Sequence, residues 1–133
     1  MLELSFDLKS CDRIGIDTEF DRRYTYFPIP SLIQISSLNN IWIIDIYKND
    51  LDLAPLKEIW RNDKIIKIFH AGDQDIAILN HILNCKVQNI FDTQLAAQAL
   101  GISNQISYEE LVAKKIYIEF IKTNHQRSDW LKR

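Results

Sequence analysis

The pattern of apolar and polar residues changes its period part-way along the chain. In the first part, β-branched residues alternate with other side chains or form short runs, which is typical of strands. Pro28 and Pro30 exclude a helix before the second run, and Asn39–Asn40 marks a turn before the third. The predicted strands are residues 13–17, 32–36 and 41–46. Their order along the chain indicates an antiparallel meander.

After residue 50, apolar positions recur at helical spacing, and short apolar runs stand between the helical segments. Pro55 suits the first turn of a helix, and Asp92 is a natural N-cap. Ser107 followed by Glu110 forms a capping-box pattern. The predicted elements are a helix from Pro55 through Trp60, a strand at 64–69, a helix at 71–83, a strand at 89–91, a helix at 93–100 and a helix from Ser107. A meander followed by strand–helix alternation predicts an α/β fold, with a mixed sheet covered by helices.

Length and composition indicate a single globular unit. The 133 residues match one ordinary domain, and 47% hydrophobic with 26% charged residues exclude a disordered or fibrous segment. Three glycines and three prolines leave no linker, so we expect residues 1–133 to form one domain. Cys11 and Cys85 match no zinc spacing and are interpreted as thiols in a reducing compartment.

The charge balance limits how this chain can bind nucleic acid. Sixteen Lys and Arg against 18 Asp and Glu give a net charge of −2, whereas proteins that neutralise many phosphates carry a broad basic surface. Any nucleic-acid contact must then be local or run through metal ions. No apolar run is long enough to span a membrane, and the first residues do not form a signal peptide. We therefore expect a cytoplasmic protein with no membrane partner.

Two acidic residues, Asp17 and Glu19, stand at the end of the first predicted strand. Side chains two positions apart on a strand point to the same face. Two like charges held together are costly unless a cation lies between them, and carboxylate oxygens suit Mg²⁺ or Mn²⁺. Taken alone, the pair is more simply interpreted as the solvated end of a strand.

A second group of polar residues, His70, Asp73 and Asp75, follows the strand at 64–69. Acids in the first turn of a helix have a structural explanation, because they complement the helix dipole and cap free N–H groups. His70 also has a structural explanation, because a histidine in a turn can simply be held by a satisfied hydrogen bond. In a third segment, residues 90–97, we interpret Asp92 as the N-cap of a helix.

These segments occur in an order that matches a known family. The stretches concerned are Ile16–Phe20, Thr25–Pro28, Leu32–Gln34, Phe69–Ala71 with Gln74–Asp75, Phe91–Gln94 with Ala96–Ala97, and Arg127–Trp130. Together they resemble the ribonuclease D family of DEDD 3′-5′ exonucleases. The resemblance runs from about Ile14 to Trp130, which is nearly the whole chain.

The resemblance implies a ribonuclease-H-like fold, in which a three-stranded antiparallel meander continues into parallel strands with flanking helices. It implies an enzyme that hydrolyses phosphodiester bonds from the 3′ end of single-stranded RNA, tRNA-like ends included. Two divalent ions, Mg²⁺ or Mn²⁺, would activate water and neutralise developing charge. Asp17 would bridge both ions, and Glu19 would hold the nucleophile-side ion. Asp75, rather than Asp73, would support the leaving-group ion.

Residues that contact the substrate are expected beside these carboxylates. The candidates for substrate binding are Thr18, Phe20, Tyr26 and His70. Phe20, Tyr26 and Phe69 are suitable flanks for a stacked terminal base. At this point, however, the hydrophobic core is the interpretation we favour for these three rings.

The family pattern ends in a motif that this chain lacks. In the family, a Tyr and an Asp four residues later complete the nucleophile-side ion site and position the attacking water. No Tyr-x-x-x-Asp follows Asp92 here. We therefore expect an incomplete domain without its last helix, a weakened nucleophile-side ion, and weak or absent activity in the chain alone. A separate C-terminal fragment is an expected partner, since the missing helix would leave an apolar sheet face uncovered.

Two other classes of function stay open. One is a non-catalytic nucleic-acid-binding remnant of the same fold, for which Asp17→Asn would leave RNA binding unchanged. The other is an α/β interaction domain whose acids are only helix caps and strand ends. Such a domain would bind neither divalent metal nor RNA.

Overall fold

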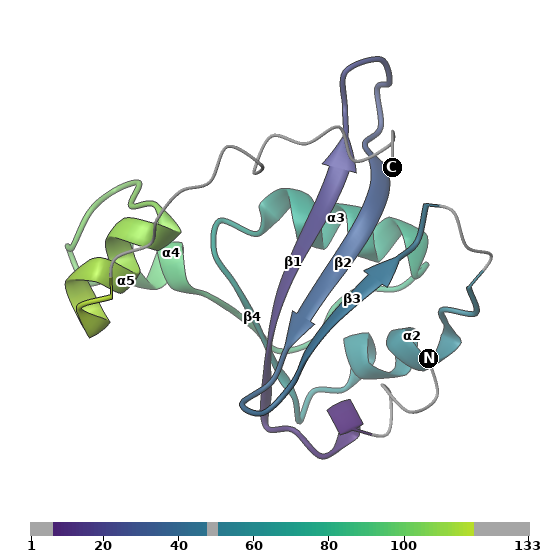
Figure 1. Ribbon diagram of the computed structural model, residues 1–133, viewed down its shortest axis with the longest axis horizontal. Coiled ribbons are helices and arrows are strands. Elements are labelled where there is room, and N and C mark those ends of the chain that lie inside the picture. Colours follow the sequence, from purple (N-terminus) through teal and green to yellow (C-terminus); the bar gives the residue numbers. More distant parts are fainter. Residues whose placement is uncertain (1–6, 48–50, 119–133) are drawn as a thin grey trace.

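A computed structural model describes residues 7–47 and 51–118 of the protein (Figure 1). Within these ranges the strands form one five-stranded sheet in the order β3-β2-β1-β4-β5. The strands are β1 (Arg13–Asp21), β2 (Ile29–Ser36), β3 (Ile41–Asp45), β4 (Ile66–Phe69) and β5 (Ile90–Asp92). After a short helical stretch at residues 7–9, the helices are α2 (Ala54–Arg61), α3 (Asp73–Ile82), α4 (Thr93–Ala99) and α5 (Tyr108–Ile116). The Arg127–Trp130 segment of the family resemblance lies outside the described residues.

The sheet is mixed, as the sequence predicts. Strand β2 pairs antiparallel with both β1 and β3, which confirms the meander. Strand β4 pairs parallel with β1, and β5 pairs parallel with β4. The predicted α/β fold with a meander, parallel strands and flanking helices is therefore confirmed.

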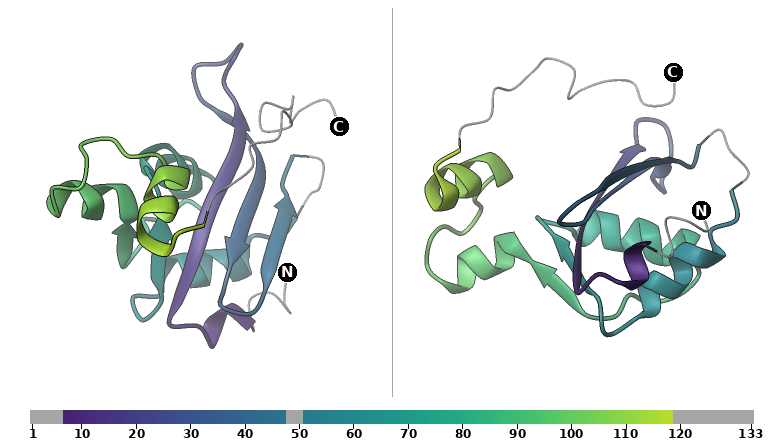
Figure 2. Two further views of the ribbon diagram at one scale, coloured as in Figure 1. Left: turned by 60° about the vertical axis from the view of Figure 1, so that its left-hand side comes forward. Right: turned by 60° about the horizontal axis from the view of Figure 1, so that its bottom comes forward.

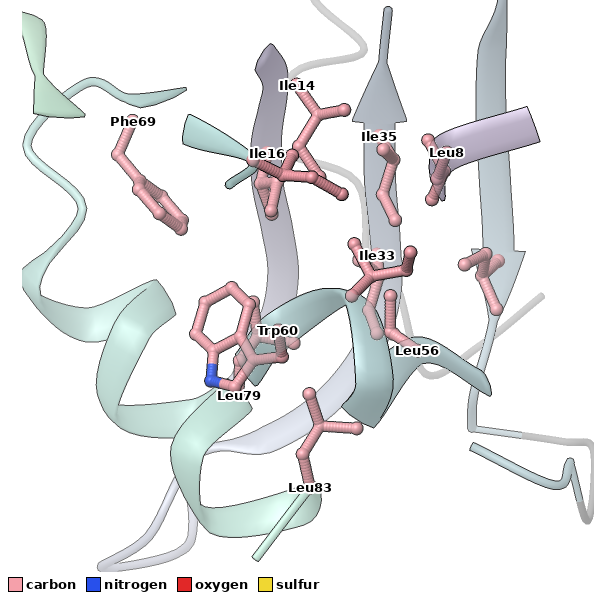
Figure 3. Close-up of a cluster of buried hydrophobic side chains, with 13 residues drawn as sticks. Leu8, Ile14, Ile16, Ile33, Ile35, Leu56, Trp60, Phe69, Leu79 and Leu83 are labelled. Atoms are coloured by element: carbon pink, nitrogen blue, oxygen red, sulfur yellow. The ribbon is translucent and has the colours of Figure 1, made fainter. Parts of the chain in front are cut away.

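The hydrophobic core lies between one face of the sheet and helices α2 and α3 (Figures 2 and 3). Strand β1 contributes Ile14 and Ile16, which are 1% and 7% exposed, because alternate side chains point to the same face. Trp60 of α2 and Leu79 of α3 cover them and are each 1% exposed. The opposite face of β1 therefore presents the residues between, and Asp17 is one of them.

The parallel strands β1 and β4 separate before β1 ends. Their ladder joins Arg13–Gly15 to Ile66–Ile68, whereas β1 continues to Asp21 alongside β2 alone. Beyond Gly15, one edge of β1 thus has no β4 partner. The β1–β2 register also shifts between Glu19 and Phe20, a bulge of the kind that re-aims side chains. Both irregularities fall on the stretch where the sequence places the candidate carboxylates.

Most element boundaries agree with the predictions, and the start of α3 is the informative exception. The helix predicted from Ala71 begins at Asp73. Ala71 has a positive φ of 56°, a left-handed conformation that interrupts helical geometry. Strand β4 is likewise shorter than predicted, whereas β1 and β2 are longer. Within the described residues, no helix is both long and apolar enough to cross a membrane.

Candidate active site

Asp17, Thr18 and Glu19 occupy the part of β1 that extends beyond β4. Thr18 points toward the core face and is only 6% exposed. Asp17 points to the other face, where the antiparallel ladder places it opposite Gln34 of β2. The alternation expected for a strand is therefore observed, and it puts Asp17 and Glu19 on one face, with Thr18 on the other.

Thr18 binds Asp75 across the gap that β4 leaves. Its backbone N–H donates to Asp75 Oδ1 at 3.0 Å, and its hydroxyl donates to the same oxygen. Since no β4 residue pairs with β1 at this point, the carboxylate takes the place of a strand partner. These bonds connect the first turn of α3 to the end of β1. They therefore bring Asp75 close to the strand segment that carries Asp17 and Glu19.

In this region, the folded structure disfavours the ionised form of the Asp17 and Asp75 carboxyl groups. Burial raises the pKa of Asp17, and the nearby negative charge of Asp75 raises it further. Burial also raises the pKa of Asp75, and Asp92 adds to this, although the hydrogen bonds from Thr18 act in the opposite direction. Ionised carboxylates held close together are penalised in this way unless a cation compensates them.

Asp92, at the end of β5, has a different role. Its Oδ1 accepts from the N–H groups of Gln94 (2.8 Å) and Leu95 (3.2 Å), which confirms the predicted N-cap of α4. The same carboxylate accepts from Ala71 at 3.2 Å and from Gly72 at 2.9 Å. Although burial opposes the shift, these hydrogen bonds lower the pKa of Asp92. Asp92 therefore also holds the turn that precedes α3, a function that the sequence did not reveal.

His70 connects β4 to the elements after β5. Its Nδ1 lies 2.9 Å from the Thr93 hydroxyl, and its Nε2 lies 2.9 Å from the carbonyl oxygen of Ile106. Because a carbonyl can only accept, Nε2 carries a proton in this bond. The ring also packs edge-on against Tyr108, with centroids 5.7 Å apart. Both nitrogens thus position the α4–α5 region, and the role of His70 in substrate binding stays a prediction.

A cavity of about 640 Å³ lies beside Asp17. It is on the face of the sheet opposite α2 and α3, which we call the open face. Its floor follows the strand register, with Asp17 next to Gln34 and Gly15 next to Ser36. His70 and Tyr108 contribute to its wall. A concave surface of this size that contains a carboxylate with a raised pKa is a suitable place for a small substrate group.

The three aromatic candidates have different environments. Phe69 is 2% exposed and belongs to the core, as favoured from the sequence. Phe20 is half-buried. Tyr26 is 88% exposed, so the core interpretation is wrong for this residue. It lies in the loop between β1 and β2, which projects past the ends of both strands (Figure 1).

The chemistry of the acidic residues fits a divalent ion. Asp17, Glu19 and Asp75 offer the hard oxygen donors that Mg²⁺ and Mn²⁺ prefer, and a cation would relieve the repulsion acting on Asp17. Among the described residues, however, no three acidic, imidazole or thiol side chains converge as a metal site. The physical reason is that Asp75 is bound on the Thr18 side of β1, while Asp17 and Glu19 point to the other. The assembled three-carboxylate site stays a prediction.

Comparison with known proteins identifies the family. A model of the 3′-5′ exonuclease family matches residues 1–133. The chain is 40% identical over 124 residues to a ribonuclease D of Zymomonas mobilis, and 36% identical over 120 residues to one of Nitrobacter hamburgensis. The chain is a member of the ribonuclease D family of 3′-5′ exonucleases. The family expected from the motif order is therefore confirmed.

The fold of a ribonuclease D structure agrees with this membership. Escherichia coli RNase D superposes with a TM-score of 0.90 at 30% identity, and the match covers 98% of this chain and 34% of that one. The two curated ribonucleases D are matched over 92% and 90% of this chain, and over 32% and 31% of their own lengths. This chain thus spans about a third of the length of its ribonuclease D relatives.

Proposed function

We propose that this chain forms the catalytic centre of a metal-dependent 3′-5′ exoribonuclease, with Asp17, Glu19 and Asp75 as the ligands of Mg²⁺ or Mn²⁺. The observation that supports this most directly is the electrostatic coupling of Asp17 to Asp75 at the end of β1 in a ribonuclease D fold. Carboxylates that repel each other where a strand ends beside the first turn of a helix are expected where a cation binds.

Each residue has a part in this proposal. Bound divalent ions would supply Lewis-acid stabilisation and an activated water. Asp17 would hold them at the edge of the open-face cavity, and Glu19 would hold one of them and orient the terminal ribose. Thr18 would be a positioning residue, because its two hydrogen bonds to Oδ1 fix the rotamer of Asp75. The cavity beside Asp17 would receive the 3′-terminal nucleotide.

RNA is the substrate that the comparisons support best. The E. coli relative is described as an exoribonuclease involved in structured RNA processing. A single-stranded 3′ end, including the 3′ end of a tRNA-like molecule, would reach the cavity without base-pair opening. Because the net charge is −2, we expect binding at the site to depend on the ions more than on a basic surface. We place this activity in the cytoplasm.

The test is degradation of a 5′-labelled single-stranded RNA in Mn²⁺, with products resolved by length. When a C-terminal continuation that contains Tyr-x-x-x-Asp is supplied, the chain should shorten the RNA from its 3′ end one nucleotide at a time, and a 3′-phosphate should block it. Asp75→Asn should abolish the ladder, whereas Asp73→Asn, two residues away and exposed, should leave it intact. Equal loss in both variants would contradict the assignment of Asp75.

A second arm tests whether a further segment completes the site. The chain is assayed alone and with a C-terminal continuation, fused or added separately, that contains Tyr-x-x-x-Asp. We expect the rate to rise by several orders of magnitude with the continuation, because such groups act as a unit. RNA binding without cleavage in either form, unchanged by Asp17→Asn, would favour the non-catalytic remnant instead.

A further inference from the structure

A second cavity, of about 680 Å³, lies between the β1–β2 loop and α3. We call it the hairpin groove. Arg22, Thr25, Tyr26 and Phe27 line it from the loop, and Gln74 and His81 line it from α3. Figure 1 shows the loop projecting past the ends of β1 and β2. The groove between the loop and α3 is open to solvent.

The hairpin groove begins beside the candidate active site. Gln74 directly precedes Asp75, so the first turn of α3 contributes to both. At 1.5 Å of rise per residue, His81 lies about 10 Å further along the helix axis than Gln74. A ligand that enters at Asp75 and follows α3 would therefore pass beneath the loop.

Exposed aromatic rings form the rim of the groove. Tyr26 and Phe27 are 88% and 68% exposed. The ring of Phe27 packs edge-on against Tyr26, with centroids 5.0 Å apart, and lies parallel to the ring of His81 at 6.0 Å. A cluster of large apolar side chains left in solvent marks a binding surface, and stacked rings of this kind suit nucleobases.

The charge of the groove is complementary to phosphate. The whole chain contains 18 Asp and Glu, yet none of the described residues that line the groove is acidic. The adjacent Arg23 is engaged elsewhere, because its Nε donates to Asp21 Oδ2 at 2.8 Å and its guanidinium lies 5.7 Å from the Tyr24 ring centroid. Arg22 is therefore the arginine that the groove itself presents.

We propose that the hairpin groove binds single-stranded RNA upstream of the 3′-terminal nucleotide. Upstream bases stack on Tyr26 and Phe27, and a backbone phosphate pairs with Arg22. This assigns Tyr26 to an internal base, whereas the sequence suggested the terminal one. The inference rests on the proposed function for the position of the 3′ end at Asp17 and Asp75. An RNA ligand accounts for the aromatic rim and for the absence of acids from the described lining together.

The experiment measures binding of 5′-fluorescein-labelled U8 and of a labelled two-nucleotide RNA by anisotropy, using the full chain with Ca²⁺ in place of Mn²⁺. Tyr26→Ala and Phe27→Ala should each weaken U8 binding about tenfold, the usual effect of removing one stacking ring. Neither change should affect the two-nucleotide RNA. Arg22→Gln should reduce the slope of log K against log salt by about 0.7, the value for one phosphate contact on a single strand.

Tyr24→Ala is the matched control. Tyr24 is 89% exposed in the same loop but does not line the groove, so its removal should change U8 affinity less than twofold. All four variants alter exposed side chains, so the fold should survive, and circular dichroism checks this.

Several outcomes would overturn the proposal. Unchanged U8 affinity in Tyr26→Ala and Phe27→Ala, or an equal loss in Tyr24→Ala, would do so. Absence of U8 binding to the unmodified chain would also overturn the proposal. A protein segment would then be the expected occupant of the hairpin groove. If Asp75→Asn stops cleavage while Tyr26→Ala binds U8 normally, the proposed function stands and this inference fails. If U8 binding depends on the groove while cleavage is insensitive to Asp75→Asn, the inference stands and the proposed function fails.

Discussion

Asp75 is held in place by Thr18 although burial and the nearby Asp92 oppose its charge. A carboxyl group whose pKa is raised by folding destabilises the folded state once it is ionised. The site thus maintains an unfavourable arrangement of charge, which is typical of positions selected for activity rather than stability. Asp17 is in the same situation, because burial and Asp75 raise its pKa.

Replacing Asp75 with Asn should therefore stabilise the chain at pH 7. The amide oxygen of Asn can still accept from Thr18, and the penalised charge is gone. We expect the melting temperature to rise by about 3 °C, the shift that about 1 kcal/mol gives in a domain of this size. Because the folded pKa is raised, the advantage should shrink as pH falls toward 4, where the carboxyl of the unmodified chain becomes protonated. Asp73→Asn is the control, and a lower melting temperature for Asp75→Asn would contradict the account.

Asp92 presents the opposite case, since its carboxylate is stabilised by the fold. Asp92→Ala removes the acceptor of four backbone N–H groups, so we expect a loss of about 2–3 kcal/mol of unfolding free energy at pH 7. A lowered folded pKa means that this contribution is present above about pH 4 and is lost as pH falls through the folded value. Urea denaturation should show that the difference in unfolding free energy between Asp92→Ala and the unmodified chain is smaller at pH 3 than at pH 7. A constant gap would mean that the charge of Asp92 is unimportant.

At the scale of elements, the turn between β4 and α3 determines where Asp75 stands. Ala71 adopts a left-handed conformation, and Gly72 lies directly against the Phe69 side chain. A Cβ built on Gly72 would lie 2.5 Å from Phe69 Cβ, far inside normal contact. The Asp92 carboxylate holds this turn in place, because it accepts hydrogen bonds from the backbone N–H groups of Ala71 and Gly72. The position of α3 thus depends on contacts with a strand that comes later in the chain.

Gly72→Ala should displace this turn. Phe69 is buried in the core, so it has little room to move, and we expect a loss of about 2 kcal/mol. RNA cleavage should fall as well, because the first turn of α3 shifts with the turn. Gly101→Ala is a useful comparison, since an added Cβ there meets nothing within 4 Å and only the positive φ of 68° is strained. Thermal unfolding that ranks Gly101→Ala as the more damaging change would contradict this account.

The elements that could be predicted from the sequence are those whose signals are local. The capping box of Ser107 and Glu110 and the N-cap of Asp92 involve residues within one helical turn, and both are confirmed. The alternation along β1 likewise predicted which face Asp17 occupies. The Thr18–Asp75 bond joins residues 57 positions apart, and no local pattern reveals it. The left-handed Ala71 was missed for the same reason, because a distant carboxylate supports it.

At the scale of the whole molecule, the sheet has two unlike faces. Helices α2 and α3 cover one face (Figure 2). The other face presents Asp17, its cavity and exposed apolar side chains such as Ile41 and Ile43, which are 77% and 66% exposed. The candidate ligands come from both sides of β1, since Asp75 approaches from the α3 side. The proposed site therefore lies at the edge of β1 where β4 has ended, between the two faces.

The most direct test of this account is an equilibrium titration with Mn²⁺, in which free Mn²⁺ is followed by electron paramagnetic resonance. The unmodified chain should bind Mn²⁺, and Asp17→Asn and Asp75→Asn should each weaken the binding at least tenfold. Asp73→Asn should leave it unchanged, because Asp73 is exposed on the same turn of α3 without the bonds that hold Asp75 at β1. Unaltered Mn²⁺ binding in Asp17→Asn and Asp75→Asn, or an equal loss in Asp73→Asn, would contradict the assignment of these carboxylates as the metal site.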